Sequence, residues 1–255
     1  MTRNKLGIST FSFMFNNGRD LIINLVKKER KKNSKMVILP VDFFHDVLCA
    51  WCYALSPRLR RLVDELKNKG IVLEVRHHCF ALAPTSDDLV RMFGSKEWAK
   101  KEILSHWRAA NVNSDEKCIR ADLMETRTHD YPFSMPGLIA CQAAAKQRGE
   151  EAHWDYFDRL QYAHLTECLD ITQEEVLIYC AKEIGLDTER FVQDLHDEQT
   201  KKAVEADIAL AREWGIGAVP ALIIAQKWHV SGAQKTERLR EIFHHVARER
   251  NEQRE

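Results

Sequence analysis

Two cysteines three residues apart, Cys49 and Cys52, stand where an apolar run gives way to an amphipathic pattern. Residues 36–44 (MVILPVDFF) are typical of a buried strand, and residues 53–70 carry apolar side chains at helical spacing up to a glycine stop. A C-x-x-C that closes a strand and opens a helix is typical of thiol–disulfide chemistry. The pattern constrains the fold as well, because the strand and the helix must meet at the cysteines.

The start of a helix is a favourable place for a sulfur nucleophile. Its first backbone N–H groups are unpaired and the helix dipole is positive there, so both favour the thiolate, which is the attacking species. We therefore expect Cys49 to be an exposed nucleophile and Cys52, one turn into the helix, to be a buried resolving thiol. Cys52 would release a mixed disulfide by closing the Cys49–Cys52 bond. Trp51 offers a flat apolar surface for a partner, or is simply a partly buried aromatic residue.

Composition indicates a globular protein without a nucleic-acid-binding core. The chain has 255 residues, of which 45 % are hydrophobic and 30 % charged. Residues 1–35 hold nine Lys/Arg and two acids, a net charge of +7, so the remaining residues carry −7. An acidic body argues against nucleic acid as a partner. No run reaches the roughly 20 apolar residues of a membrane span, so no membrane association is expected.

The cysteine count favours a reducing compartment. There are seven cysteines, an odd number, and they lack the regular spacing of a disulfide framework. A secretory signal in residues 6–15 is the competing interpretation, but that stretch is short and is followed by Asn-Asn-Gly rather than by small residues. We therefore expect a cytoplasmic protein.

The order of secondary structure gives a fold class. A second strand is predicted at residues 71–76, and residues 87–214 are almost entirely helical in pattern. Strand character returns at 219–225 and 228–230, which read as a hairpin, and a last helix covers 236–248. The chain is thus predicted to be α/β, with β-α-β, a long helical insertion, and β-β-α.

These elements suggest three segments. Residues 1–35 form a basic extension that is expected to be flexible. Residues 36–86 and 201–250 would make one α/β domain, and residues 87–200 would make the inserted all-helical domain.

With its C-x-x-C, this outline resembles the thioredoxin fold with an inserted helical domain, as in the DsbA family. It is most similar to the FrnE-like branch and its relatives, the 2-hydroxychromene-2-carboxylate isomerases. The resemblance covers roughly residues 37–248. It rests on residues 46–53 (DVLCAWCY), on Pro57 in the active-site helix, on residues 217–220 (GAVP) and on residues 230–234 (VSGAQ).

The resemblance implies roles for residues around the cysteines. Pro220 would follow a cis peptide bond in a loop beside the active site, leaving the backbone of Val219 open to pair with an extended substrate. Ala50 departs from the proline that many family members carry, which affects the reduction potential. From its position alone, Asp46 would relay protons for Cys52 or cap the helix, or would be an ordinary solvent-facing acid.

The function predicted from these observations is a protein disulfide oxidoreductase of the DsbA family, with Cys49 and Cys52 as catalytic residues. Its partners would be protein or small-molecule thiols and disulfides. In a reducing cell, reduction or isomerisation is more plausible than oxidation. No bound cofactor is expected, although an external thiol such as glutathione or a thioredoxin-type protein would exchange electrons with the pair.

Two alternatives remain open. One is a glutathione-dependent isomerase or transferase on the same fold, in which Cys49 would be incidental. The other is a non-enzymatic binding module with zinc held by the cysteines, to which residues 77–79 (HHC) could contribute. Zinc sites usually show a second closely spaced pair such as H-x₃-H or another C-x-x-C, and this sequence has neither, so no metal site is predicted.

Overall fold

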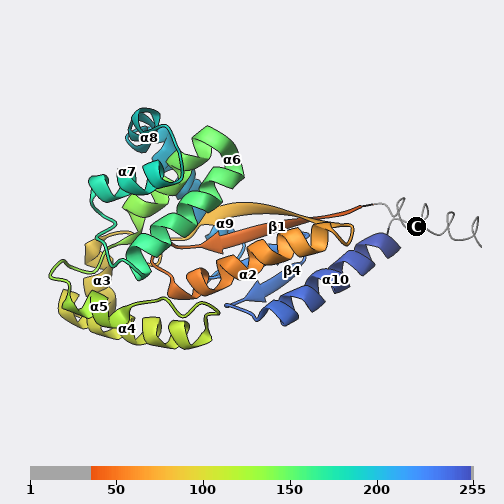
Figure 1. The fold of residues 1–255 in the computed structure, drawn as a ribbon, viewed down its shortest axis with the longest axis horizontal. Helices are drawn as coiled ribbons and strands as arrows, with labels where there is room; N and C mark the ends of the chain where they lie inside the picture. The colour runs from red at the N-terminus through yellow and green to blue at the C-terminus, as the bar shows by residue number, and fades with distance from the viewer. Residues whose placement is uncertain (1–35, 254–255) are drawn as a thin grey trace, which may run out of the picture.

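The computed structural model describes residues 36–253, and the predicted basic extension, residues 1–35, lies outside them. One sheet runs through the molecule, and a group of helices extends from one end of it (Figure 1). In chain order the elements are β1 (Val37–His45), α2 (Ala50–Lys67), β2 (Ile71–Cys79), α3 (Ser86–Phe93), α4 (Lys96–Asn113), α5 (Ala121–Thr126), α6 (Ser134–Leu165), α7 (Glu174–Glu183), α8 (Thr188–Leu195), α9 (Glu198–Glu213), β3 (Ala221–Ile224), β4 (Trp228–Ser231) and α10 (Thr236–Glu252).

The sheet has the strand order β2-β1-β3-β4. β1 and β2 are parallel, with Val37 opposite Ile71 and His45 opposite Cys79. β3 is antiparallel to both β1 and β4. The order of elements is therefore the predicted β-α-β and β-β-α, with α3 to α9 inserted between β2 and β3.

The second half of β1, residues 41–45, is buried on both faces, which suits the apolar character of the strand. Successive side chains of a strand point to opposite faces. On one face, Val41 and Phe43 belong to the main core, to which α10 contributes Phe243. On the other face, Phe44 packs with Ala211 of α9 in a smaller cluster. The end of β1 is thereby held between two layers of helices.

α2 starts at the cysteines and carries its apolar side chains at helical spacing. The helix ends at Lys67, and Gly70, with φ of +80°, turns the chain into β2. Its fully buried leucines are Leu55, Leu59, Leu62 and Leu66.

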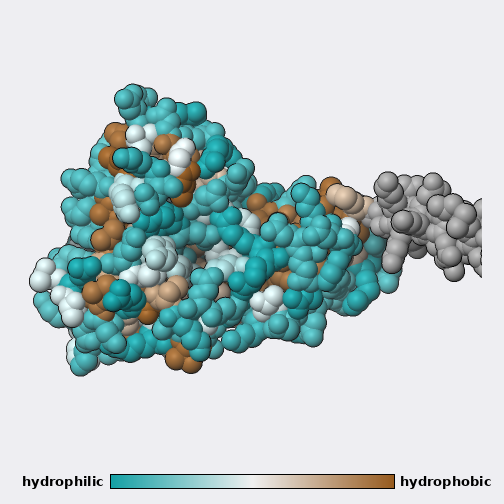
Figure 2. All heavy atoms as spheres, in the orientation of Figure 1, coloured by the Kyte–Doolittle hydropathy of each residue, from teal (hydrophilic) through white to brown (hydrophobic). Residues whose placement is uncertain are grey.

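α6 packs closely against residues 46–49, the loop between β1 and α2, which is called the active-site loop below. A Cβ atom at Gly137 would lie 2.8 Å from Cγ2 of Val47, so this close approach requires glycine. The helix is kinked at Arg148 and Gly149, where the backbone is not helical and the glycine has φ of +66°. In the orientation of Figure 1, the surface of the molecule is mainly hydrophilic, with hydrophobic residues in small groups (Figure 2).

The domain division into residues 36–86 with 201–250 and 87–200 stays a prediction. α9 begins at Glu198, so the proposed boundary at residue 200 falls inside that helix. Between residues 36 and 253, no helix combines the length and the apolar character needed to cross a membrane.

Candidate active site

Cys49 and Cys52 lie together at the start of α2. Cys49 is the N-cap residue, and its sulfur accepts a hydrogen bond from the backbone N–H of Cys52 at 3.2 Å. The thiol of Cys49 also donates to the carbonyl oxygen of Val219 at 3.5 Å. The sequence-based placement of the pair at a strand–helix junction therefore matches the structure.

The two thiols are both shielded from solvent. Cys52 is fully buried, and burial, followed by its hydrogen bond with Cys49, raises its thiol pKa well above the usual range. Cys49 is only 6 % exposed, so the expectation of an exposed nucleophile is wrong. Side chains from the helical insertion cover it, a tertiary contact that the sequence pattern did not indicate.

Cys49 is nevertheless reachable from a cavity of about 270 Å³. Its near wall includes the predicted support residues Ala50, Trp51 and Val219. Its far wall comes from the helical insertion and is mainly apolar, with contributions from Leu89, Met92, Phe93, Ile103, Trp107 and Tyr131. An apolar ligand group could therefore sit beside the Cys49 sulfur.

The loop before β3 closes the near side of this cavity. The peptide bond between Val219 and Pro220 is cis, as predicted, and Pro220 is buried. Val219 is half-buried and directs its carbonyl to Cys49. Among the backbone hydrogen bonds within residues 36–253, none uses the N–H of Val219.

Asp46 is a buried anchor and neither a helix cap nor a solvent-facing acid. Its carboxylate accepts hydrogen bonds from the N–H of Leu48 at 2.9 Å, the N–H of Leu82 at 2.6 Å and the hydroxyl of Ser134 at 2.7 Å. Burial raises its pKa to about 6, and these hydrogen bonds oppose that shift. The cap interpretation of Asp46 is wrong because Cys49 caps α2, and the solvent-facing interpretation is wrong because Asp46 is fully buried. A proton-relay role stays a prediction.

Gln161 of α6 is a site residue that sequence reasoning missed. Its side-chain N–H groups donate to the carbonyl oxygens of Asp46, Val47 and Cys49, the last at 2.9 Å. The carbonyls of Asp46 and Cys49 also accept from backbone N–H groups, whereas that of Val47 has no backbone donor within the described residues, so Gln161 supplies its hydrogen bond. The signal in the sequence was an amide that helical spacing places on the same face as the apolar Phe157 and Leu165.

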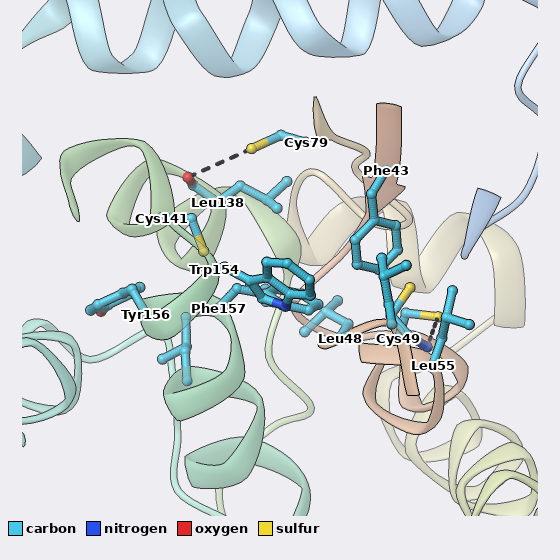
Figure 3. Packing of buried hydrophobic residues seen from close by; sticks show 14 of the residues in the cluster. Phe43, Leu48, Cys49, Leu55, Cys79, Leu138, Cys141, Trp154, Tyr156 and Phe157 are labelled. Carbon is cyan, nitrogen blue, oxygen red and sulfur yellow. Dashed lines mark hydrogen bonds between the residues drawn. The ribbon is translucent and has the colours of Figure 1, made fainter. Parts of the chain in front are cut away.

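Residues 77–79 do not join the two active-site cysteines. His78 faces the other side of the sheet and bonds to Asp42 and Asp207. Cys79 is directed toward Leu138, away from Cys49 (Figure 3). His78 points to the opposite face from its two neighbours. Among the described residues, no group of three potential metal ligands combines residues 77–79 with Cys49 or Cys52, so the zinc site shared with the cysteines is not formed by these residues.

The thioredoxin family model matches residues 43–237 of the chain. This protein belongs to the thioredoxin family. Among curated proteins, this thioredoxin-family chain is similar to the ClpXP adapter protein SpxH. It is 29 % identical to SpxH of Halalkalibacterium halodurans over 76 % of the chain and 60 % of the relative, and 26 % identical to that of Bacillus licheniformis over 72 % and 57 %. The chain thus spans less than two thirds of these relatives.

Solved structures identify the variety of the thioredoxin fold. A protein from Nitrosomonas europaea, provisionally named a protein disulfide isomerase, superposes with a TM-score of 0.66 at 16 % identity, covering 83 % of this chain and 98 % of that one. The cytosolic disulfide reductase DsbM of Pseudomonas aeruginosa gives 0.61 at 19 %, covering 84 % and 98 %. A 2-hydroxychromene-2-carboxylate isomerase gives 0.58 at 15 %, covering 84 % and 98 %. The predicted thioredoxin fold with a helical insertion, as in the DsbA family, is confirmed, and the FrnE-like branch is consistent with these neighbours.

Proposed function

We propose that this protein is a thiol–disulfide oxidoreductase that works through the Cys49–Cys52 pair. One observation carries the proposal: the Cys49 sulfur accepts from the Cys52 N–H at a helix start and lines an apolar cavity. A helix N-terminus and a backbone donor both stabilise a developing thiolate. The fully buried Cys52 lies one helical turn on, where a resolving thiol is needed.

The reaction balances with these two thiols alone. The Cys49 thiolate attacks one sulfur of a substrate disulfide, so the substrate S–S bond breaks and one substrate thiol leaves with a proton from solvent. Cys52 then loses its proton and attacks the Cys49 sulfur, which releases the second substrate thiol. Two electrons have passed to the substrate, and the Cys49–Cys52 disulfide has formed.

Return to the dithiol requires an external thiol, for which glutathione or a thioredoxin-type protein is suitable. Reduction or isomerisation in the cytoplasm is the direction we favour. The cysteine usage supports it, because the seven cysteines are odd in number and lack the regular spacing of a disulfide framework.

The cavity indicates the class of substrate. Its apolar wall favours a disulfide with an apolar or aromatic group next to the sulfur, either in a protein or in a small molecule. The free N–H of Val219 beside the cavity would pair with an extended peptide, which favours protein substrates. Asp46 and Gln161 would hold the loop that presents Cys49.

Trapping the mixed disulfide tests this mechanism. Cys52→Ser keeps the nucleophile and removes the resolving thiol, so incubation with a peptide disulfide should leave one half-peptide attached to Cys49, visible by mass spectrometry. Cys49→Ser should give no adduct and lower the rate of disulfide reduction at least ~100-fold. Cys118→Ser is the matched control, because Cys118 is half-buried and bonds to Tyr53 away from the pair. Full activity in Cys49→Ser would refute the proposal.

An adapter role is the second candidate, since the curated relatives are named adapter proteins. An adapter, like a glutathione-dependent isomerase, would not need the pair to cycle. A Cys49→Ser/Cys52→Ser variant that kept full function would therefore favour these alternatives over redox catalysis.

A further inference from the structure

We propose that His45, His77 and His153 form a buried binding site for a divalent transition-metal ion of the zinc class, separate from the cysteine pair. The site goes beyond the redox function and departs from the expectation that no metal is bound. His45 ends β1, His77 lies in β2, and His153 lies in α6 just after its kink. Three segments distant in sequence thus bring their imidazole rings together.

The spacing of the rings suits a single ion. The ring centroids are 5.2 Å apart for His45 and His77, 5.2 Å for His45 and His153, and 5.1 Å for His77 and His153. An imidazole nitrogen about 2.0–2.1 Å from zinc puts the ring centroid about 3.2 Å from the ion, so two tetrahedral ligands have centroids about 5.2 Å apart. The three measured separations agree with that value.

The nitrogen positions agree as well. One ring nitrogen from each histidine lies within 4.8 Å of the others. Nε2 of His45 and Nδ1 of His77 are 3.2 Å apart, close to the roughly 3.4 Å between two tetrahedral zinc ligands. The His153 nitrogen, within 4.8 Å of the other two, would have to approach them to about 3.4 Å to complete a tetrahedral set.

The cluster holds polar atoms that the protein leaves without partners. All three side chains are more than nine-tenths buried, at 0 %, 4 % and 2 % exposure for His45, His77 and His153. Nδ1 of His45 and Nε2 of His77 and His153 have no hydrogen-bond partner within the described residues. A neutral imidazole carries one N–H and one lone pair, so the His45–His77 hydrogen bond leaves one N–H and one lone pair unpaired for either pair of tautomers.

Plain aromatic packing is the competing explanation. Phe157 lies 4.0 Å from the His45 ring and Trp154 lies 4.9 Å from the His77 ring, centroid to centroid. Packing accounts for the burial but not for the choice of three imidazoles, since phenyl rings would fill the space without unpaired nitrogens. Coordination through one nitrogen of each ring would pair three lone pairs with the ion, in place of the single His45–His77 hydrogen bond.

The chemistry of the ligands selects the kind of ion. Three imidazoles suit Zn²⁺, Cu²⁺, Ni²⁺ or Fe²⁺, whereas Mg²⁺ and Ca²⁺ prefer oxygen ligands. Burial lowers the pKa of all three rings, which keeps them neutral and able to coordinate at neutral pH. Glu150 accepts from the His77 backbone N–H at 2.8 Å and brings negative charge toward the ion. The positive charge of Arg60 also acts on His77 and disfavours a cation there.

Metal titration tests the site directly. The full-length chain without a polyhistidine tag should carry Cys49→Ser and Cys52→Ser, so that the dithiol cannot supply the ligands. Residues 1–35 contain no histidine or cysteine, so they add no competing imidazole or thiolate ligand. After chelator treatment, Zn²⁺ should bind with one equivalent and raise the thermal midpoint in a concentration-dependent way. Co²⁺ should give visible d–d bands without a thiolate charge-transfer band.

Matched variants locate the ion. His153→Phe keeps an aromatic ring and should weaken Zn²⁺ binding at least ~100-fold. His164→Phe is the control, because His164 lies in the same helix and is equally buried but belongs to a different cluster, so its variant should bind like the parent. Less than about 0.1 equivalent of zinc bound by the Cys49→Ser/Cys52→Ser chain, or a thiolate band with Co²⁺, would overturn the proposal.

Discussion

The sulfur of Cys49 lies 3.5 Å from the carbonyl oxygen of Val219, a residue 170 positions later in the chain. The contact joins the first strand–helix junction to the loop before β3, so the β-α-β and β-β-α parts of the fold meet at Cys49, the proposed nucleophile. The same sulfur accepts from the N–H of Cys52. Under the proposed mechanism, a substrate disulfide in the cavity would meet Cys49 next to the backbone N–H of Val219, which has no backbone partner within the described residues.

The apolar cavity should control substrate choice. Met92 lines it and is 53 % exposed, so Met92→Glu should fold normally while adding a charge that an apolar substrate group must desolvate. We expect KM to rise about tenfold, or 1.4 kcal/mol, for a disulfide bearing an aromatic group. Glutathione disulfide should be little affected. The control is Val112→Glu, at a 72 % exposed position of α4 that does not line the cavity; equal effects of the two variants would contradict this role.

The anchor of the active-site loop should be measurable in unfolding experiments. Ser134 donates to Asp46 and accepts from the N–H of Ala83 at 3.1 Å. Ser134→Ala leaves both groups short of a partner in a buried site, so the free energy of unfolding should fall by about 1–3 kcal/mol. Ser105→Ala, at an exposed serine of α4, should change it by less than about 0.5 kcal/mol. Urea titration of both variants provides the comparison.

Arg58 should contribute far more to stability than its neighbour Arg61, although both pair with Asp115. The Arg58 side chain is fully buried and also donates to the carbonyl oxygens of Ala233 and Gln234, whereas that of Arg61 is 48 % exposed. Arg58→Met leaves these acceptors unpaired and should cost about 3–5 kcal/mol. Arg61→Met should cost less than about 1 kcal/mol. Similar losses in the two variants would rule out the buried network as the cause.

His164 should make the protein less stable in acid. Burial lowers its pKa to about 3, below the value of about 6.5 expected for the unfolded chain. The unfolded state therefore binds a proton that the folded state excludes, so the stability present above pH 6.5 is lost as the pH falls toward 3. Between pH 7 and pH 5 this residue alone should account for about 2 kcal/mol of that loss.

His164→Gln isolates this contribution. The amide oxygen can still accept from Tyr131, which bonds to Nε2 of His164 at 3.2 Å. The difference in unfolding free energy between pH 7 and pH 5 should shrink in this variant by about 2 kcal/mol. An unchanged difference in His164→Gln would show that the ring does not titrate in this way.

Local features of the site could be predicted from the sequence. The C-x-x-C between an apolar strand and an amphipathic helix placed Cys49 and Cys52, and the loop at residues 217–220 placed Val219 and Pro220. The first placement depends on a short-range pattern that needs no knowledge of the tertiary structure, whereas the second came from the resemblance to the DsbA family. Strand alternation could also have separated His77 from His78, since neighbouring side chains in a strand face opposite ways.

The helices inserted between β2 and β3 supply the site residues that the sequence pattern did not predict. Gln161 and Ser134 both come from α6, and Trp107 of α4 covers the cavity beside Cys49. Which faces of these helices meet the active-site loop depends on packing, such as the close approach of Gly137 to Val47, and helical periodicity alone does not determine it. The shielding of Cys49 was missed for the same reason.

The most direct test of the redox mechanism is a titration of the Cys49–Cys52 pair. The purified protein would be equilibrated across glutathione redox buffers, its free thiols trapped with a mass tag, and the tagged cysteines assigned by mass spectrometry. We predict that the pair converts as one two-electron couple with a midpoint between about −120 and −270 mV. Failure of the disulfide to form, or conversion at other cysteines while this pair stays reduced, would contradict the mechanism.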